Sequence, residues 1–237
     1  MKLWVLFLFG YLSCFCQTTL VKNADNFIGV DFFENYYYIQ NGVLHKSNLE
    51  NQYQNIEYGI PDGVDISNPL QILVFYKLFN RVIVLDNRLN SIYSFKTPFG
   101  TNCIANAGKD KIWLYNNTNT SLTIYNYRTQ KMEVSSLPTV KDVQQLKGNL
   151  NQAWILDQNG ILSTYNYLAR NTHRKNTVNT LLPISLSSAY HIQDSQLWKQ
   201  ENPILKIPQS IHSFEVVNKQ CYYFNGKQIY RLSIPKN

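Results

Sequence analysis

The chain of 237 residues carries 44% hydrophobic, 14% aromatic and 16% charged residues, and its net charge is +7. This length suits one medium domain or two small ones, and a low charge combined with many aromatic residues excludes a disordered chain. The 28 asparagines and 16 glutamines against only 6 alanines argue against a helical bundle or coiled coil. We therefore expect an all-β protein of short strands joined by polar turns.

The first 16 residues have the three parts of a secretory signal peptide. Lys2 supplies the positive charge, the apolar run LWVLFLF follows, and cleavage after Cys16 leaves Gln17 as the new N-terminus. The apolar run is too short to remain as a membrane anchor. We therefore expect a signal peptide over 1–16, rather than a core strand, and a single domain over 17–237 with a charge of 21 − 15 = +6.

A lipid anchor is an alternative fate for the N-terminus. The segment YLSC, which ends at Cys14, is an imperfect lipobox, because it lacks the usual aliphatic residue three positions before the cysteine. Lipidation of Cys14 would tether the protein to a membrane, whereas cleavage after Cys16 would release it. In both cases we expect the protein in the periplasm or on the periplasmic face of the outer membrane.

Short apolar and aromatic runs recur along the rest of the chain. Each run leads into a polar turn, and three of these turns contain an Asn-Gly pair, which supplies the positive φ of tight hairpins. The last apolar residues of the runs, which serve as anchors of the repeat, are Ile39, Phe75, Tyr115, Leu156 and Phe224. Their spacings are 36, 40, 41 and 68 residues, so a degenerate unit is expected midway in the last interval, at 190–198.

The repeat predicts a β-propeller. Helical repeats would need apolar residues at i, i+3, i+4 and i+7 over a dozen residues, whereas these runs are short, β-branched and aromatic. Each unit then forms a small antiparallel sheet, and the ring closes by pairing the N- and C-terminal strands. Division of 17–237 by six gives about 37 residues per blade. Six blades are favoured, with five larger blades or an irregular β-sandwich as alternatives.

Two segments, 27–44 and 68–90, resemble small exported propeller-like proteins of gliding-type, outer-membrane-bearing bacteria, and so does the Cys16–Gln17 cleavage context. The resemblance covers most of the chain but includes no catalytic signature, so it implies fold and location only. Periplasmic propellers of such bacteria often resemble accessory subunits of outer-membrane export or assembly machines, for which the type IX secretion translocon is the first example.

The sequence contains no motif that is typical of an enzyme or a metal site. It has no nucleophile elbow, no glycine-rich phosphate loop and no pair of histidines at ligand spacing. Asp62 and Asp65 in a Pro-Asp-Gly turn form at most a small acidic rim, and a solvated turn is the favoured interpretation. We therefore predict no catalytic residues, no metal and no cofactor, and a protein that is not an enzyme.

The strongest charge feature is a basic and aromatic group in the fourth repeat. Such groups suit nucleic acids, because phosphates attract cations and bases stack on rings, but an exported protein rarely meets nucleic acid. The same group suits an acidic protein, an anionic glycan or lipid headgroups. We predict a partner-docking site, with no nucleic acid, at Tyr165, Tyr167, Arg170, Arg174 and Lys175.

The two cysteines of the mature chain test the predicted ring. Export would permit a disulfide between Cys103 and Cys221. The repeat places them in the third and sixth units, which lie opposite each other in a six-bladed ring, and a disulfide needs Cα atoms within about 7 Å. We therefore predict two free and largely buried thiols.

These observations lead to one function and one alternative. The favoured function is a non-catalytic, periplasm-facing binding or scaffold subunit of an outer-membrane or secretion complex. The alternative is a glycan-acting propeller enzyme or a glycan-binding module, whose acid and base groups would come from separate blades. Several carboxylates or histidines converging at the central opening would favour the alternative.

Overall fold

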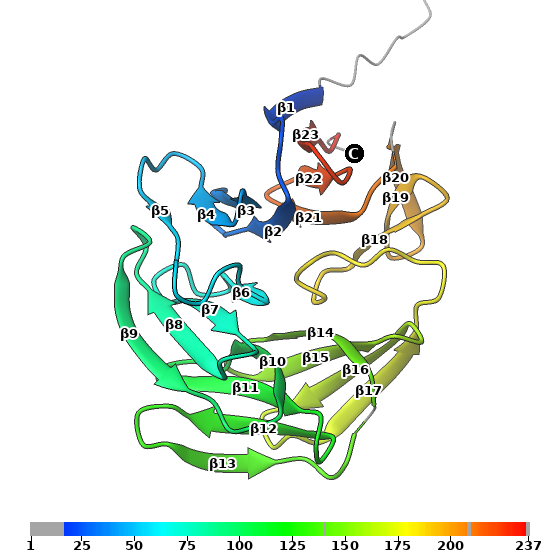
Figure 1. Ribbon diagram of the computed structural model, residues 1–237. Coiled ribbons are helices and arrows are strands. Elements are labelled where there is room, and N and C mark those ends of the chain that lie inside the picture. The colour runs from blue at the N-terminus through cyan, green and yellow to red at the C-terminus, as the bar shows by residue number, and fades with distance from the viewer. Residues whose placement is uncertain (1–16, 140, 208–209, 236–237) are drawn as a thin grey trace, which may run out of the picture.

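The computed structural model describes residues 17–139, 141–207 and 210–235, and its regular elements are strands. The predicted signal peptide over 1–16 and the lipidation candidate Cys14 lie outside the described residues. The strands form six antiparallel sheets arranged as the blades of a ring (Figure 1), which confirms the predicted six-bladed propeller. Within the described chain, no helix is long and apolar enough to cross a membrane.

The blades, named A to F in chain order, use these strands. Blade A contains β2 (Asn26–Val30), β3 (Tyr36–Gln40), β4 (Val43–Lys46) and β5 (Gln52–Tyr53). Blade B contains β6 (Gly63–Asp65), β7 (Ile72–Tyr76), β8 (Arg81–Leu85) and β9 (Ser91–Lys96), and blade C contains β10 (Thr101–Asn106), β11 (Lys111–Asn116), β12 (Ser121–Asn126) and β13 (Lys131–Ser135). Blade D contains β14 (Val143–Gly148), β15 (Gln152–Asp157), β16 (Ile161–Asn166) and β17 (Asn171–Asn176). Blade E contains β18 (Tyr190–Gln193), β19 (Gln196–Lys199) and β20 (Asn202–Lys206), and blade F contains β21 (Ser213–Val217), β22 (Gln220–Phe224), β23 (Ile229–Ser233) and β1 (Gln17–Val21).

The ring is closed by its two chain ends. Strand β1 pairs antiparallel with β23, with Gln17 opposite Leu232 and Thr19 opposite Tyr230, so the first described strand is the outermost strand of the last blade. Figure 1 shows β1 and β23 side by side at the outer edge of the last blade. The predicted pairing of the N- and C-terminal strands is therefore confirmed.

The antiparallel order gives the ring two distinct faces. Because each blade has an even number of strand positions, the chain returns to the same end of the ring before every innermost strand. We call the end where innermost strands begin the entry face, and the end where they finish the exit face. The entry face carries the β5–β6 and β9–β10 loops and the β7–β8 turn, and the exit face carries the β2–β3 and β14–β15 turns.

Side chains of asparagine and aspartate hold many of the turns. The Asp31 carboxylate accepts hydrogen bonds from the N–H groups of Phe33 and Asn35, both at 2.9 Å. Asp86 repeats this arrangement with the N–H groups of Arg88 and Asn90, at 2.8 and 2.9 Å. Similar side-chain acceptors occur at Asn126, Asn149, Asp157, Asn166 and Asn225. The abundance of asparagine therefore serves backbone N–H groups that the sheet ladders leave unpaired.

The blades pack against one another through apolar clusters. Five clusters of buried side chains fill the A–B, B–C, C–D, E–F and F–A interfaces. Among the described residues, no such cluster fills the interface between blades D and E, which we call the D–E seam. This seam is therefore held less by apolar burial than the other five.

Blade E also lacks a regular innermost strand. In this blade only Leu181 occupies that place, where it forms an isolated antiparallel bridge with Ile192 of β18. Strand β18 is thus the second strand of its blade, and Ile192 takes the place of the anchors Leu156 and Phe224. The structure confirms the degenerate unit expected at 190–198. It also shows that this blade lacks its innermost strand, which accounts for the weak repeat in the sequence.

The two cysteines lie in opposite blades, as predicted. Cys103 is in β10 of blade C and Cys221 is in β22 of blade F, and both thiols are free. Cys221 is fully buried, and burial raises its pKa to about 12. Cys103 is only half-buried and lines the central cavity, and burial raises its pKa to about 11.

The packing of blade C on blade D depends on Gly148, the last residue of β14. A Cβ atom at this position would lie 2.4 Å from Cδ1 of Trp113 and 2.9 Å from the carbonyl oxygen of Asn106. We expect Gly148→Ala to lower the free energy of unfolding by about 1–3 kcal/mol, because these buried groups must move. The measurement is chemical denaturation, with Gly63→Ala of β6 as control, since a Cβ there meets nothing within 4 Å. Equal stability of the two variants would contradict this close approach.

Candidate functional site

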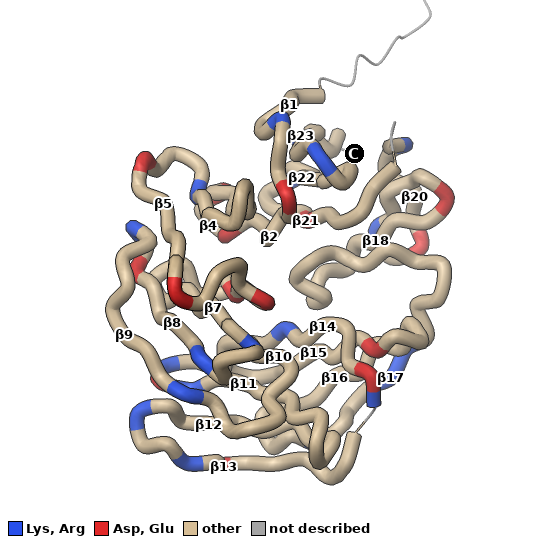
Figure 2. Tube along the Cα trace, in the orientation of Figure 1, with Lys and Arg blue, Asp and Glu red and all other residues tan. Residues whose placement is uncertain are grey.

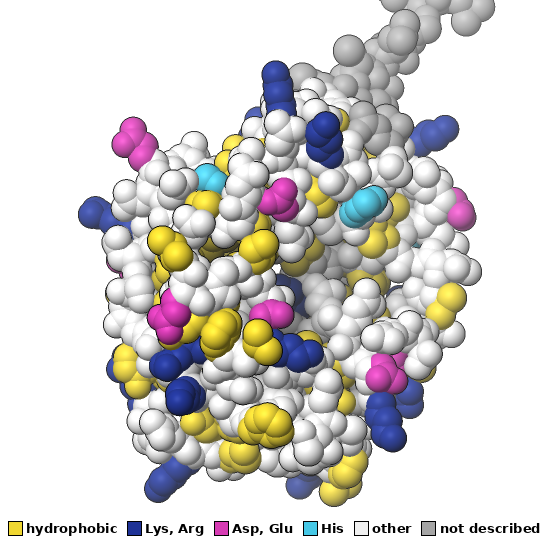
Figure 3. Space-filling model, viewed as in Figure 1, with side chains coloured by type: hydrophobic (Ala, Val, Ile, Leu, Met, Phe, Trp, Pro, Cys, Tyr) yellow, Lys and Arg dark blue, Asp and Glu magenta, His cyan; other side chains and the backbone are white. Residues whose placement is uncertain are grey.

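The centre of the ring contains two connected cavities. The entry cavity has a volume of about 350 Å³ and is lined by the first residues of innermost strands, including Asn26, Asn102 and Gln144. The exit cavity has a volume of about 280 Å³ and is lined by the ends of these strands. Both cavities share Ile28, Ile184 and Lys147, which lie where the two meet. Figure 3 shows the hollow at the centre of the ring.

The segment 181–189, which replaces the missing strand of blade E, contributes to both cavities, because Ile184 lines both and Ser185 and Ser187 line the exit cavity. The Ile184 N–H donates to the carbonyl oxygen of Phe214 at 2.9 Å, and the Gln145 amide donates to the Ile184 carbonyl at 3.1 Å. The Ser185 N–H donates to the Glu215 carboxylate at 2.7 Å. Blades D and F thus both hold this segment, which we call the plug.

Three buried carboxylates line the exit cavity, a convergence that the sequence did not reveal. Asp31 is 3% exposed, Asp65 is 3% exposed and Glu215 is 5% exposed. Asp31 accepts from its own turn and from the Tyr37 hydroxyl at 3.0 Å, and Asp65 accepts from Ser67 and from the Asn106 N–H at 3.0 Å. These bonds give each aspartate a structural role.

Glu215 is the carboxylate that fixes the plug. It accepts from the Ser185 N–H and hydroxyl and from the Val216 N–H, at 2.7, 3.1 and 3.1 Å. Burial raises its pKa, and the hydrogen bonds from Ser185 and Val216 and the charge of Lys147 offset this effect only in part.

Lys147 and Trp154 are lining residues of the exit cavity that remain available to bind a ligand. They are cross-strand partners in blade D, so their side chains lie on the same face of the sheet. Both are half-buried and both line the exit cavity. Neither the Lys147 ammonium nor the Trp154 N–H has a hydrogen-bond or ion-pair partner among the described residues. Figure 2 shows the basic position of β14 at the inner edge of its blade.

The predicted docking group is not a single patch. Tyr165 is 4% exposed and packs in the core between blades C and D, so the prediction that it contacts a partner is wrong. It faces inward because it alternates with outward residues along β16. Tyr167 is half-buried, and its hydroxyl accepts from the Lys111 ammonium at 3.1 Å.

The three basic residues of the group are exposed but point to different sides. Arg170 lines a groove between blades C and D. Arg174 and Lys175 are successive residues of β17, so they lie on opposite faces of blade D. The structure therefore separates these cations, and their role in docking stays a prediction.

The predicted acidic rim is also divided. Asp62 is exposed and lines the entry cavity, whereas Asp65 is buried and lines the exit cavity. The favoured solvated turn therefore fits Asp62 but is wrong for Asp65, and the two residues form no common rim, because strand β6 places them at opposite ends of the channel. Within the described chain, no group of three His, Cys, Asp or Glu side chains is placed to hold a metal ion.

An apolar patch lies on the entry face around blade B. Its exposed fractions are 92% for Ile56, 67% for Ile60, 84% for Leu78, 44% for Phe79 and 85% for Phe99. These five residues, which we call the entry patch, lie in the β5–β6 loop, the β7–β8 turn and the β9–β10 loop. Figure 3 shows hydrophobic side chains grouped beside the hollow over blades B and C.

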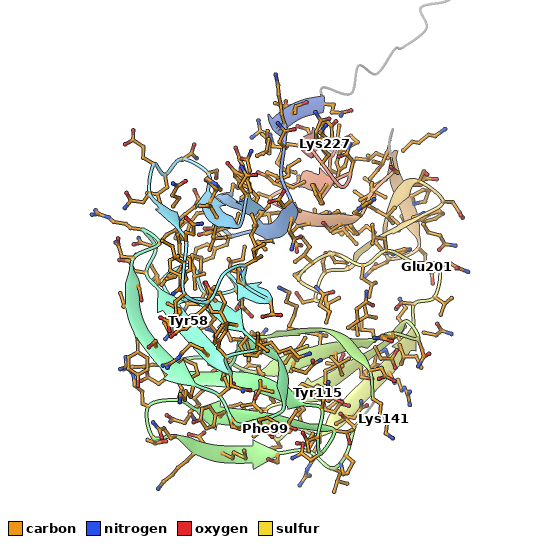
Figure 4. All side chains as sticks on the ribbon, in the orientation of Figure 1. Tyr58, Phe99, Tyr115, Lys141, Glu201 and Lys227 are labelled. Carbon is orange, nitrogen blue, oxygen red and sulfur yellow. The ribbon has the colours of Figure 1, made fainter. Side chains whose placement is uncertain are left out.

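The entry patch encloses a groove. Leu78 and Phe99 line a cavity of about 470 Å³ together with Asp62 and Lys77. At the other side of the patch, the ring of Tyr58 packs against that of Phe79 in a tilted arrangement, with centroids 4.9 Å apart. Figure 4 labels Tyr58 and Phe99, which lie on either side of blade B.

Comparison with known proteins supports the fold. No protein-family model and no curated protein matches the sequence. A streptogramin B lyase structure aligns with a TM-score of 0.61 at 9% identity, over 93% of this chain and 98% of that one. The WD40 repeats of RRP9 align with a TM-score of 0.62 at 8% identity, over 94% and 98% of the two chains. A virginiamycin B lyase from Staphylococcus aureus aligns with a TM-score of 0.56 at 10% identity, over 93% and 100%. At these identities the similarity shows the β-propeller fold alone.

The buried carboxyl group of Glu215 generates a pH-dependent stability. Because its folded pKa lies above the ordinary 4.5, the folded protein binds this proton more tightly than the unfolded chain. The free energy of unfolding should therefore fall as the pH rises from 4.5 through the raised pKa. Glu215→Gln should remove this part of the pH dependence.

The measurement is denaturant unfolding across this pH range. The matched control is Glu50→Gln, which changes an exposed carboxylate and should keep the wild-type pH dependence. If Glu215→Gln also keeps the wild-type pH dependence, the pKa of Glu215 is not raised by burial in the folded protein.

Proposed function

We propose that the protein is a non-catalytic binding or scaffold subunit that docks a partner protein on its entry patch. The observation that carries this proposal is the exposure of five large apolar side chains from adjacent loops at one end of the ring. Large apolar side chains gathered on one part of a surface are typical of sites that a partner covers. Aromatic anchors surrounded by polar groups are typical of protein interfaces.

The shape of the patch favours a protein over a flat membrane surface. The groove between Leu78 and Phe99 is concave and takes a protruding apolar side chain. Asp62 and Lys77 also line the groove; Asp62 accepts from the Lys77 N–H and the Lys77 ammonium donates to Asn102, so each has hydrogen-bonding capacity left for the same partner. We therefore place the partner's anchor side chain between Leu78 and Phe99.

The cellular setting of this proposal rests on the sequence. The signal peptide predicted over 1–16 supports export, and the resemblance to propeller-like proteins of gliding-type bacteria supports an outer-membrane or secretion complex, such as the type IX translocon. A lipid at Cys14 would hold the ring at the membrane, and a chain cleaved after Cys16 would be free in the periplasm. Anionic glycans or lipid headgroups remain secondary partners for the basic residues of β17.

A glycan-acting enzyme or glycan-binding module is the second candidate. Asp31, Asp65 and Glu215 on the wall of one cavity favour it, because glycosidases use paired carboxylates. It ranks second because all three accept hydrogen bonds from the protein itself. A general acid or base must instead be free to reach its substrate.

The docking proposal predicts a selective loss of binding. We expect the double variant Leu78→Asp with Phe99→Asp to lose the co-purifying protein when the complex is isolated from detergent-solubilised envelopes. Burial of a charge without a partner disfavours the complex, and loss of two anchors should weaken it at least about 100-fold. Recovery is measured by quantitative mass spectrometry of the purified complex.

The matched control is Leu168→Asp, which changes a residue of similar type that is 54% exposed in the β16–β17 turn. It should keep the partner. Because all three residues are largely exposed, the variants should melt within a few degrees of the wild type. Isolation of the wild-type protein alone would contradict the proposal, as would an unchanged partner yield with the double variant.

A further inference from the structure

Trp113 and Trp154 occupy the same position of the repeat, two residues before the anchors Tyr115 and Leu156. Trp113 is 0% exposed, because strand β14 of the next blade covers it through Gly148. Its N–H donates to the carbonyl oxygen of Asn149 at 2.9 Å. Trp154 faces the D–E seam, where the next blade has no regular innermost strand. Trp154 is thus left half-buried and lines the exit cavity.

The absence of a regular innermost strand in blade E also leaves a cation, Lys147, beside the indole of Trp154. Lys147 is paired with Trp154 across β14 and β15, and both line the exit cavity. Among the described residues that line the two central cavities, Lys147 alone is a cation. Its three donors have no hydrogen-bond or ion-pair partner within the described chain. The cavity therefore offers an ammonium group and a ring face on one wall.

The remaining walls of the exit cavity are rich in hydroxyl, amide and carboxylate groups. Ser67, Ser185, Ser187 and Asn149 line it together with the three carboxylates. Carboxylate oxygens accept hydrogen bonds from hydroxyl groups, and they repel a doubly charged phosphate about twice as strongly as a singly charged carboxylate. The volume of about 280 Å³ suits a molecule the size of one sugar ring.

We infer that the exit cavity binds an acidic sugar, with its carboxylate on Lys147, one ring face on Trp154 and its hydroxyl groups on the polar wall. An aromatic face next to a charged group is a suitable surface for a ring that is apolar on one side and polar at its edge. This site is on the exit side of the plug and does not depend on the entry patch, so it stands or falls separately from the proposed function.

The test is calorimetric titration of the folded protein with D-glucuronate, D-galacturonate and N-acetylneuraminate, together with tryptophan fluorescence. At least one of these acids should bind with a dissociation constant of about 1 mM or tighter. D-Glucose, which lacks the carboxylate, should bind at least about tenfold more weakly, because a charge-assisted hydrogen bond is lost. Inorganic phosphate should likewise bind more weakly than the acid.

Two variants locate the site. Lys147→Gln should weaken binding of the acid about tenfold or more, and Trp154→Phe should reduce the fluorescence change on binding. The matched control is Lys199→Gln, because Lys199 lies next to Trp198 and over the Tyr190 ring at 5.6 Å, outside both cavities. It should bind the acid as the wild type does.

Three results would overturn the inference. These are no saturable binding of any of the three acids at about 50 mM, equal binding of glucose or phosphate, and unchanged binding by Lys147→Gln. If Lys147→Gln does not fold, the comparison of glucuronate with glucose on the wild-type protein still shows whether the cavity recognises the carboxylate of the sugar. Loss of the envelope partner from the entry patch would leave every one of these results unchanged.

Discussion

Five of the six interfaces between blades are filled by apolar clusters, and the need to bury both faces of a blade determines the rest of the structure. In blade B all five residues of β7 are buried, so neither face of that strand is available to water. Such a sheet is stable only when a neighbouring sheet covers each of its two faces. In an open row the first and the last sheet would each expose one apolar face to water, so the row must close into a ring. The pairing of β1 with β23 supplies the closure and also covers the edge of the last blade.

The D–E seam is the place where this constraint is relaxed. The plug there replaces a strand, so polar and charged side chains of blade D face a cavity instead of a neighbouring sheet. Glu215 and Gln145 hold the plug with hydrogen bonds, which compensate for the apolar contacts that the other interfaces have. Lys147 and Trp154, whose polar atoms have no partner in the described chain, therefore lie at the least apolar interface between blades.

Much of the fold could be predicted from the sequence because the repeat is local. The anchors Ile39 and Phe75 end apolar runs whose pattern depends on burial within the blade itself, and the Asn41–Gly42 hairpin has the positive φ values, 53° and 75°, that its residues indicate. The degenerate unit at 190–198 could also be placed, because the anchors Leu156 and Phe224 lie 68 residues apart, about two repeat lengths.

The site could not be predicted, because it depends on what the next blade supplies. Trp113 and Trp154 have the same sequence context, yet one is buried and the other lines a cavity. Tyr165 illustrates the opposite error: a tyrosine close to basic residues in the chain faces the core, since alternate residues of a strand face opposite sides. The convergence of Asp31, Asp65 and Glu215 joins the first two blades to the last, which is distant in sequence.

The closure also sets the order in which the molecule is completed. Strand β1 is synthesised before every other described strand, but its partner β23 comes after all the others. Contacts between such distant parts of a chain form slowly, and an unpaired strand can associate with other chains in the meantime. The sequence of β1 suits this waiting period, because Thr18 and Thr19 are polar and stay exposed even in the finished ring. Completion of the ring therefore waits for the last strand, and the two central exposed threonines make β1 less apolar than the inner strands of the blades while it remains unpaired.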